Sequence, residues 1–343
     1  MEAKFDMPWY HAPPRPWVLA VKIGPHQHPS RVVLAPMAGV TDRPFRDLCR
    51  TLGAHWAVGE MLTSDLKLWS SVKSSKRRVQ IDETEPRWVQ IAGAEPTEMA
   101  RAAQACEAEG AQIIDLNMGC PAKKVCHRAA GSALMRDEAL VEQILSAVVS
   151  AVSVPVTLKM RLGWSLDQQN AVTIAQMAES IGVQLLTVHG RSRACRFEGP
   201  VHYDRIAEVR QAVSIPLIAN GDIQSAAEAE QVLAMTGAAG VMIGRAAQGK
   251  PWLPGLIDQA LSGEAVPNEP GFAEQVDILH RHVRALHEFY EGIQGVRIAR
   301  KHVNWFLDHL NLESGFKQAF NRLDAQSDQR RFLDRLADRK DAA

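Results

Sequence analysis

Cys120 stands where a thiol could take part in chemistry. It follows residues 113–116, a mainly apolar run typical of a buried parallel strand, and Gly119 and Pro121 turn and end that strand beside it. A thiol at the open end of a strand can act as an acid, a base or a nucleophile where exposure and nearby charge allow it. A free cysteine is also often a small buried hydrophobic residue. The residues around Cys120 alone leave both interpretations open.

Polar residues and glycines also gather at the ends of the other predicted strands. In a (β/α)8 barrel the working residues come from the carboxyl ends of the strands. Each of these residues could singly be a cap or a loop residue, but together they indicate one site. They are residues 36–39, Glu60, Gln90, Asn117, Lys159, Arg161, His189, Arg191, Asn220, Gly221, Asp222, Gly244 and Arg245.

Two glycines and an arginine predict a phosphorylated cofactor. Gly221 and Gly244 follow the seventh and eighth predicted strands, where such barrels frequently bind phosphate through backbone amides. Arg245 adds a planar donor group suited to phosphate. Lys159 and Gln90 could reach the ring end of that cofactor, where a cation stabilises an anionic reduced ring. A structural ion pair is the alternative for Lys159.

The elements that must position these residues are short apolar strands alternating with helices. This alternation predicts an α/β protein with a (β/α)8 barrel. A doubly wound sheet is the alternative, but no GxGxxG follows the first strand. The predicted strands cover residues 32–36, 56–61, 88–92, 113–117, 156–160, 185–189, 217–219 and 240–243, and the predicted helices cover residues 43–52, 96–109, 138–151, 167–181, 203–212 and 225–235.

The sequence also makes predictions for the segments outside the barrel core. Residues 18–23 and 31–34 are expected to form a hairpin that leads into the first strand, and residues 64–85 give no clear pattern. Prolines mark residues 1–17 as an irregular extension. The predicted barrel spans residues 18–255, a linker spans residues 256–271, and residues 272–343 predict a small C-terminal all-helical domain.

Composition narrows the possible environments and partners. Lys plus Arg and Asp plus Glu both number 39, so a polyanion must be met by a local basic patch. The five cysteines show no CxxC spacing, which argues against a disulfide framework, a zinc site or an iron–sulfur cluster. No apolar run approaches the roughly 20 residues of a membrane helix. We therefore expect a cytoplasmic protein with no metal and no membrane contact.

Several motifs together resemble those of the tRNA-dihydrouridine synthases. They are residues 35–46, 115–121, 159–161, 188–191 and 219–223, with the highly specific Asn-Met-Gly-Cys-Pro at residues 117–121. Residues 120–125, 243–249 and 297–302 are most similar to the bacterial B subfamily. The resemblance covers residues 24–324, so residues 1–17 inherit nothing from it.

The resemblance implies an FMN-dependent, NADPH-driven reduction of a D-loop uridine in tRNA, at position 17. By resemblance, Cys120 is the general acid, while Asn117 and Arg191 face the substrate base. The implied flavin contacts are Pro36, Met37 and Ala38 along the flavin, Gln90, Lys159 and His189 near its ring system, and Asn220, Gly221, Asp222, Gly244 and Arg245 at its ribityl-phosphate end.

Basic residues outside the strand ends predict where tRNA would bind. Lys123 and Lys124 follow the catalytic cysteine, and Arg297, Arg300 and Lys301 share one helical face opposite an apolar one. Such charges are often only solvated surface, but here they suit contacts with the phosphates of tRNA. We expect the enzyme to be a monomer. Two rival functions remain, a flavin barrel enzyme acting on a small free pyrimidine or enone, and a non-enzymatic RNA chaperone.

Overall fold

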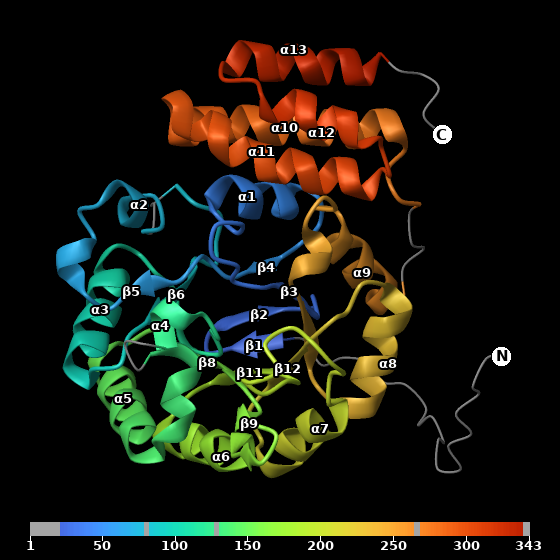
Figure 1. The fold of residues 1–343 in the computed structure, drawn as a ribbon. Coiled ribbons are helices and arrows are strands. Elements are labelled where there is room, and N and C mark those ends of the chain that lie inside the picture. The colour runs from blue at the N-terminus through green and yellow to red at the C-terminus, as the bar shows by residue number, and fades with distance from the viewer. Residues whose placement is uncertain (1–20, 79–81, 127–129, 264–267, 339–343) are drawn as a thin grey trace, which may run out of the picture.

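A curled parallel sheet forms the centre of the protein, seen in the computed structural model of Figure 1. The structure describes residues 21–78, 82–126, 130–263 and 268–338, so the predicted extension over residues 1–17 lies outside it. The strands of this sheet are β3 (Val32–Leu34), β4 (Trp56–Ala57), β5 (Leu62–Thr63), β6 (Trp88–Ala92), β7 (Ile113–Met118), β8 (Val156–Arg161), β11 (Leu185–His189), β12 (Leu217–Asn220) and β13 (Gly240–Ile243).

The sheet closes through a strand that is broken in two. Its order is β4-β3-β13-β12-β11-β8-β7-β6-β5, with parallel neighbours throughout. In place of the predicted strand over residues 56–61 there are two short strands: β4, at the start of that range, pairs with β3, and β5, just after it, pairs with β6. A bridge from Val58 to Trp88 joins the two edges. The predicted barrel architecture is thereby confirmed.

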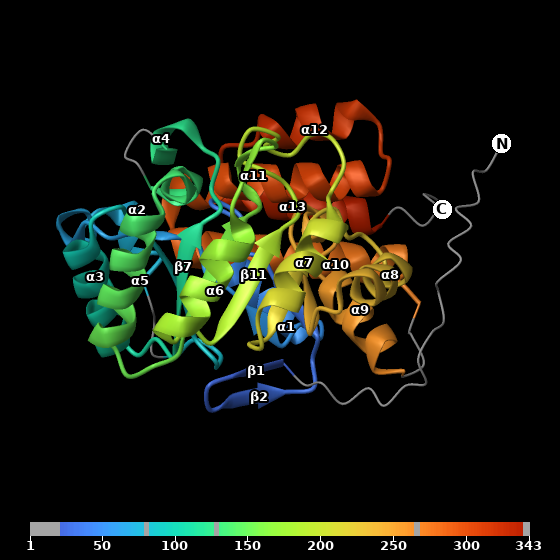
Figure 2. The ribbon, with the colours of Figure 1, turned by 90° about the horizontal axis from the view of Figure 1, so that it is seen from below.

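The predicted hairpin has a different second strand. β1 (Val21–Ile23) pairs antiparallel with β2 (His26–His28), and residues 31–34 lie in the barrel instead, so that part of the prediction is wrong. Gly24 and Pro25 form a tight turn that places Ile23 opposite His26, so residues 26–28 and not 31–34 lie opposite the first strand. The hairpin packs Val21 and Ile23 against the inner residues of the barrel, at the end remote from the strand carboxyl ends (Figure 2).

Helices cover the outside of the sheet close to where the sequence predicts them. They are α1 (Arg43–Thr51), α3 (Pro96–Ala108), α5 (Glu138–Ala151), α6 (Ala171–Ile181), α7 (Tyr203–Ala212) and α8 (Ala226–Thr236). A further outer helix, α9 (Leu253–Ser262), was not predicted. α6 begins later than predicted because β9 (Gly163–Ser165) and β10 (Gln168–Gln169) form a small hairpin before it. Residues 64–85 contain η1 (Leu66–Leu68) and α2 (Val72–Ser75).

α9 occupies residues that the sequence assigned to a linker. It packs beside β3, α1 and α8 as a barrel helix. Gly255 permits this packing, since a Cβ at that position would lie 2.0 Å from the carbonyl oxygen of Leu52.

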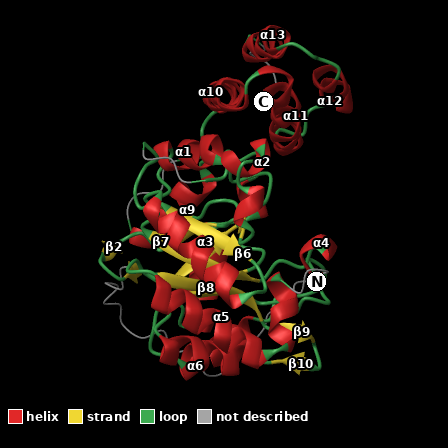
Figure 3. Cartoon of the chain, turned by 90° about the vertical axis from the view of Figure 1, so that its left-hand side faces the viewer, coloured by secondary structure: helices red, strands yellow, loops and turns green. Residues whose placement is uncertain are grey.

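The C-terminal helices form a layer beside α1 (Figures 1 and 3). They are α10 (Phe272–Tyr290), α11 (Gly292–His309), α12 (Ser314–Asn321) and α13 (Gln326–Ala337). Their buried core includes Val283, Phe306 and Leu333, but also Leu48 of α1 and Trp252 from the barrel. The hydrophobic cluster of the C-terminal helices therefore extends onto the outer surface of the barrel. Within the described part of the chain, no helix is long and apolar enough to cross a membrane.

Candidate active site

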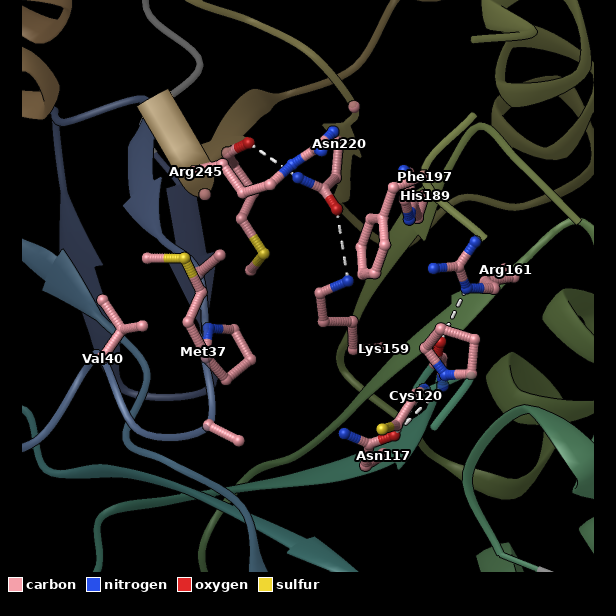
Figure 4. Close-up of a pocket in the computed structure, with 18 of the residues that line it drawn as sticks. Met37, Val40, Asn117, Cys120, Lys159, Arg161, His189, Phe197, Asn220 and Arg245 are labelled. Carbon is pink, nitrogen blue, oxygen red and sulfur yellow. Dashed lines mark hydrogen bonds between the residues drawn. The ribbon is translucent and has the colours of Figure 1, made fainter. Parts of the chain in front are cut away.

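A cavity of about 1030 Å3 opens at the carboxyl ends of the barrel strands (Figure 4). Its wall contains every residue that the sequence assigned to the cofactor, together with Cys120 and Asn117. The parallel register explains this gathering, because β7, β8, β11, β12 and β13 end at the same edge of the sheet. Residues far apart in the sequence are therefore brought to one site.

A chain of hydrogen bonds holds the backbone of Cys120. The Asp115 carboxylate accepts from Thr157 Oγ1 and from Gln90 Nε2, both at 2.7 Å. Gln90 Oε1 accepts from Asn117 Nδ2 at 2.7 Å, and Asn117 Oδ1 accepts from the backbone N–H of Cys120 at 3.0 Å. Burial raises the pKa of Asp115 to about 6, which leaves it mostly ionised at neutral pH. Since a carboxylate only accepts, it fixes how the two amides are turned.

The Cys120 thiol is kept protonated. Its side chain is half-buried, and burial raises the pKa of the thiol above its ordinary value. Arg161 Nε donates to the carbonyl oxygen of Gly119 at 2.7 Å, which holds the turn before the thiol. The arrangement suits a group that gives a proton away at neutral pH.

Lys159 and His189 form the middle of the cavity wall. Lys159 Nζ donates to Asn220 Oδ1 at 3.2 Å, and Asn220 Nδ2 donates to the carbonyl oxygen of Met242 at 2.8 Å. Burial lowers the pKa of Lys159 to about 8, so it still carries a positive charge at neutral pH. Burial and neighbouring cations lower the pKa of His189, which is therefore neutral. Among the described residues Lys159 forms no ion pair, contrary to the structural alternative raised from the sequence.

Asp222 joins two arginines at one end of the cavity. Arg245 Nη2 donates to Asp222 Oδ1 at 2.8 Å, and Arg191 Nη2 donates to Asp222 Oδ2. Hydrogen bonding from Arg191 lowers the pKa of Asp222. Arg245 lies on the cavity wall, whereas Arg191 is only 3% exposed and lies behind it, bonded also to the carbonyl oxygen of Gly199. Arg191 thus faces Asp222 and not the open cavity.

The cavity also contains residues that the sequence did not assign to a ligand. The Phe197 side chain is 50% exposed at the wall, with the guanidinium groups of Arg161 and Arg245 over its ring at 5.4 and 4.9 Å. Arg161 lies at the end of a strand, and this position could have marked it as a residue of the site. Phe197 lies in the loop between β11 and α7, where neither spacing nor residue type marks it. Arg196 lies on the same wall.

A family model described as dihydrouridine synthase (Dus) matches residues 33–342 of the chain. The chain belongs to the dihydrouridine synthase family. Its relatives named tRNA-dihydrouridine synthase B include the protein of Pseudomonas aeruginosa, which is 57% identical over 88% of this chain and 91% of the relative. The protein of Proteus vulgaris is 53% identical over 90% of this chain and 96% of the relative. The family consists of flavin-dependent oxidoreductases.

The chemistry of the cavity wall fits a flavin that carries a phosphate. Among the described residues of the wall, Lys159, Arg161, Arg196 and Arg245 are cationic and Asp222 is the one carboxylate, so this part of the wall carries an excess of positive charge. Its volume lies at the top of the range for ligand pockets, roughly 300–1,000 Å3, which leaves room for a ring system and a nucleobase. Within the described residues no cluster of three or more His, Cys, Asp or Glu is arranged to hold a metal ion.

The basic residues predicted to bind RNA are placed differently from one another. Arg297 is exposed on α11, but Arg300 donates to Asp324 Oδ1 at 2.6 Å and to the carbonyl oxygen of Leu323 at 3.0 Å. Lys301 donates to the carbonyl oxygen of Gly39. Two of the three cations expected on a free basic face, Arg300 and Lys301, therefore bond to other residues of the same chain. The side chains of Lys123 and Lys124 lie outside the described residues, while their backbone forms α4 (Lys123–Cys126).

Proposed function

We propose that this chain reduces the C5–C6 double bond of uridine 17 in the D-loop of tRNA, with FMN as cofactor and NADPH as reductant. The observation that carries the proposal is one cavity in which a protonated thiol, Cys120, shares the wall with the buried cation Lys159. The relatives named tRNA-dihydrouridine synthase B support tRNA as the substrate. The enzyme would act as a monomer in the cytoplasm.

Different residues of the cavity wall would bind different parts of the flavin. Arg245, with Gly221, Asp222 and Gly244 beside it, would hold the phosphate end, and Asp222 orients the Arg245 guanidinium. Pro36, Met37 and Ala38 supply an apolar side of the cavity. Gln90, Lys159 and His189 would contact the ring system from the opposite strands, where the charge of Lys159 stabilises negative charge on the ring.

Cys120 completes the reduction of the base. When bound, reduced FMN supplies the hydride that C6 of uracil accepts. The Cys120 thiol gives its proton to C5 and is left as a thiolate, which recovers a proton from solvent. Asn117 holds the Cys120 backbone through its Oδ1, so that the acid stays in place while the base enters. Hydride and proton together saturate the double bond.

The target uridine must leave the folded tRNA to reach this cavity. We infer that the backbone of the tRNA contacts the helical region, residues 272–343, with Arg297 as its exposed cation on α11. Lys123 and Lys124, next to Cys120 in the sequence, are further candidates for phosphate contacts. Arg191 would act on the substrate only indirectly, by fixing Asp222.

The test compares Cys120→Ala with the control Cys126→Ala, which removes a neighbouring thiol in α4. We expect Cys120→Ala to be reduced by NADPH at a normal rate but to be reoxidised by tRNA at least about 100-fold more slowly, since general acids contribute roughly 10²–10⁴. Cys126→Ala should behave as wild type in both steps. Rapid single-turnover formation of dihydrouridine by Cys120→Ala would refute the acid role, and equal reoxidation by free uridine would point to a small pyrimidine substrate.

A further inference from the structure

Two charged side chains from different parts of the fold hold the peptide groups of Gly39. The Gly39 N–H donates to Glu60 Oε1, and its carbonyl oxygen accepts from Lys301 Nζ. Glu60 lies in the barrel between β4 and β5 and is buried, whereas Lys301 belongs to α11. The backbone of Gly39 has a φ of +77°, a conformation that suits glycine.

The segment held in this way is one side of the cavity. Pro36, Met37, Ala38 and Val40 lie on the cavity wall, and Gly39 is the residue among them that does not. Glu60 and Lys301 therefore hold the loop on the side that faces away from the cavity. A Cβ built on Gly39 would have only one non-neighbouring atom within 4 Å, Lys301 Nζ at 3.5 Å. Because packing is sparse there, hydrogen bonding positions the loop.

Glu60 is itself fixed. Arg77 Nη2 donates to Glu60 Oε1 at 2.7 Å, and Arg77 Nη1 reaches the carbonyl oxygen of Met61, another wall residue, at 3.4 Å. The carboxylate thus has a cationic partner of its own, the partly buried Arg77, which holds it beside the Gly39 N–H.

The same loop receives a second contact from the C-terminal helices. The Tyr290 hydroxyl, at the end of α10, donates to Asp42 Oδ2 at 2.9 Å. Asp42 Oδ1 accepts from the N–H of Phe45 at 3.1 Å and so caps α1. Both ends of residues 39–42 are therefore tied to the C-terminal helices, one through Lys301 and one through Tyr290.

We propose that Lys301 and Glu60 are positioning residues that hold the β3–α1 loop against the cofactor, so that the seating of the C-terminal helices sets the affinity of the barrel for FMN. The proposal rests on the proposed flavin function of the cavity. It replaces the expectation that Lys301 contacts tRNA phosphate, because its ammonium group lies on the loop behind the cavity wall.

The first measurement is the dissociation constant of FMN, followed by flavin fluorescence on dilution of the full-length holoprotein. Lys301→Met, which keeps the aliphatic stem, should weaken FMN binding by about tenfold, equivalent to about 1.4 kcal/mol. Lys301→Arg should restore most of the affinity. Arg300→Met is the matched control on the same helix. Among the described residues Arg300 bonds to Leu323 and Asp324 and to no residue of the β3–α1 loop, so this variant should leave FMN affinity unchanged.

The second measurement is hydrogen exchange of the Gly39 amide, which reports the loop directly. Exchange should be faster in Lys301→Met and in Glu60→Gln, with the latter weakening FMN binding by about threefold because a neutral acceptor is roughly half as strong. Unchanged FMN affinity and exchange in a folded Lys301→Met protein would overturn the proposal, and a lower tRNA affinity alone would return Lys301 to the RNA surface. A wild-type chain that retains no FMN would instead refute the flavin function.

Discussion

At the scale of residues, one buried carboxylate, Asp115, fixes the orientation of the amide groups next to Cys120. Asp115 faces two donors, Thr157 and Gln90, and the order of donors and acceptors then runs without a break to the Cys120 backbone. If the side-chain amide of Gln90 or Asn117 were rotated by 180°, two donors or two acceptors would face each other and a hydrogen bond would be lost. Such an unmet buried group costs about 1–3 kcal/mol.

Asp115→Asn should disturb this order. The new amide cannot accept from both Thr157 and Gln90, so Gln90 and Asn117 lose their single orientation. We expect a loss of about 1–3 kcal/mol in the free energy of unfolding. We also expect reoxidation by tRNA to slow by about tenfold, the equivalent of about 1.4 kcal/mol, with reduction by NADPH unchanged.

Thr157→Val is the control for this variant. It removes one hydrogen bond from Asp115 but leaves the bond to Gln90, so it should cost stability without slowing reoxidation. Denaturant unfolding and single-turnover kinetics measure the two effects. Equal slowing in both variants would show that the rate follows stability and not the orientation of the amides.

The sequence indicated one end of this hydrogen-bonded chain, at Gln90, Asn117 and Cys120, but not the other end, at Asp115 and Thr157. Cys120 and Asn117 are marked by their place at a strand end. The link from Asp115 to Thr157 joins neighbouring strands across 42 residues of sequence, and a single sequence carries no record of that pairing. Phe197 was missed for a similar reason, because only the folded loop brings it beside Arg161 and Arg245.

At the scale of elements, two buried histidines lie where the C-terminal helices meet the barrel. His282 of α10 and His302 of α11 have ring centroids 4.6 Å apart, and the ring of Phe45 from α1 lies 5.5 Å from His282. Neither nitrogen of His282 has a hydrogen-bond partner among the residues that the structure describes. Burial lowers the pKa of His282 to about 3, with a further lowering by the charge of Lys301, so the ring stays neutral in the folded protein.

This neutrality predicts a loss of stability in acid. The unfolded chain binds a proton at His282 below about pH 6.5 and the folded protein does not, so the folded state loses about 1.4 kcal/mol per pH unit, or about 2 kcal/mol by pH 5. Unfolding by urea at pH 7.5 and pH 5 should show this difference between wild type and His282→Gln. Burial raises the pKa of Asp42 to about 6, so protonation of Asp42 favours the folded state in acid. This contribution is the same in both proteins and cancels when their pH dependences are compared. An identical pH dependence in the two proteins would contradict the prediction.

Helices and strands with strong periodicity were predicted well, and short segments were not. The strands over 88–92, 185–189 and 240–243 and the helices over 138–151 and 203–212 have the predicted bounds. The errors in strand pairing fall at residues 31–34 and 56–61, where two or three residues decide the pairing. There the closure of the barrel, a tertiary effect, outweighs the local pattern.

At the scale of the whole molecule, the family and the barrel were predictable, while the surface for RNA was not. Equal numbers of acidic and basic residues give no net attraction to tRNA, so the charges that matter are local. Helical spacing alone placed Arg297, Arg300 and Lys301 on one face. It could not show that Asp324 and the Gly39 carbonyl oxygen meet two of them, because those partners come from other elements.

Mapping of dihydrouridine in cellular tRNA would show whether this chain makes that nucleotide and at which position. Total tRNA would be taken from cells of the source organism that lack the gene, and from the same cells carrying the wild-type gene or the Cys120→Ala variant. We predict that dihydrouridine at position 17 is lost with the gene, returns with the wild-type chain and stays absent with the variant. Full dihydrouridine at position 17 in cells without the gene would contradict that assignment, and unchanged dihydrouridine at every position would contradict the activity.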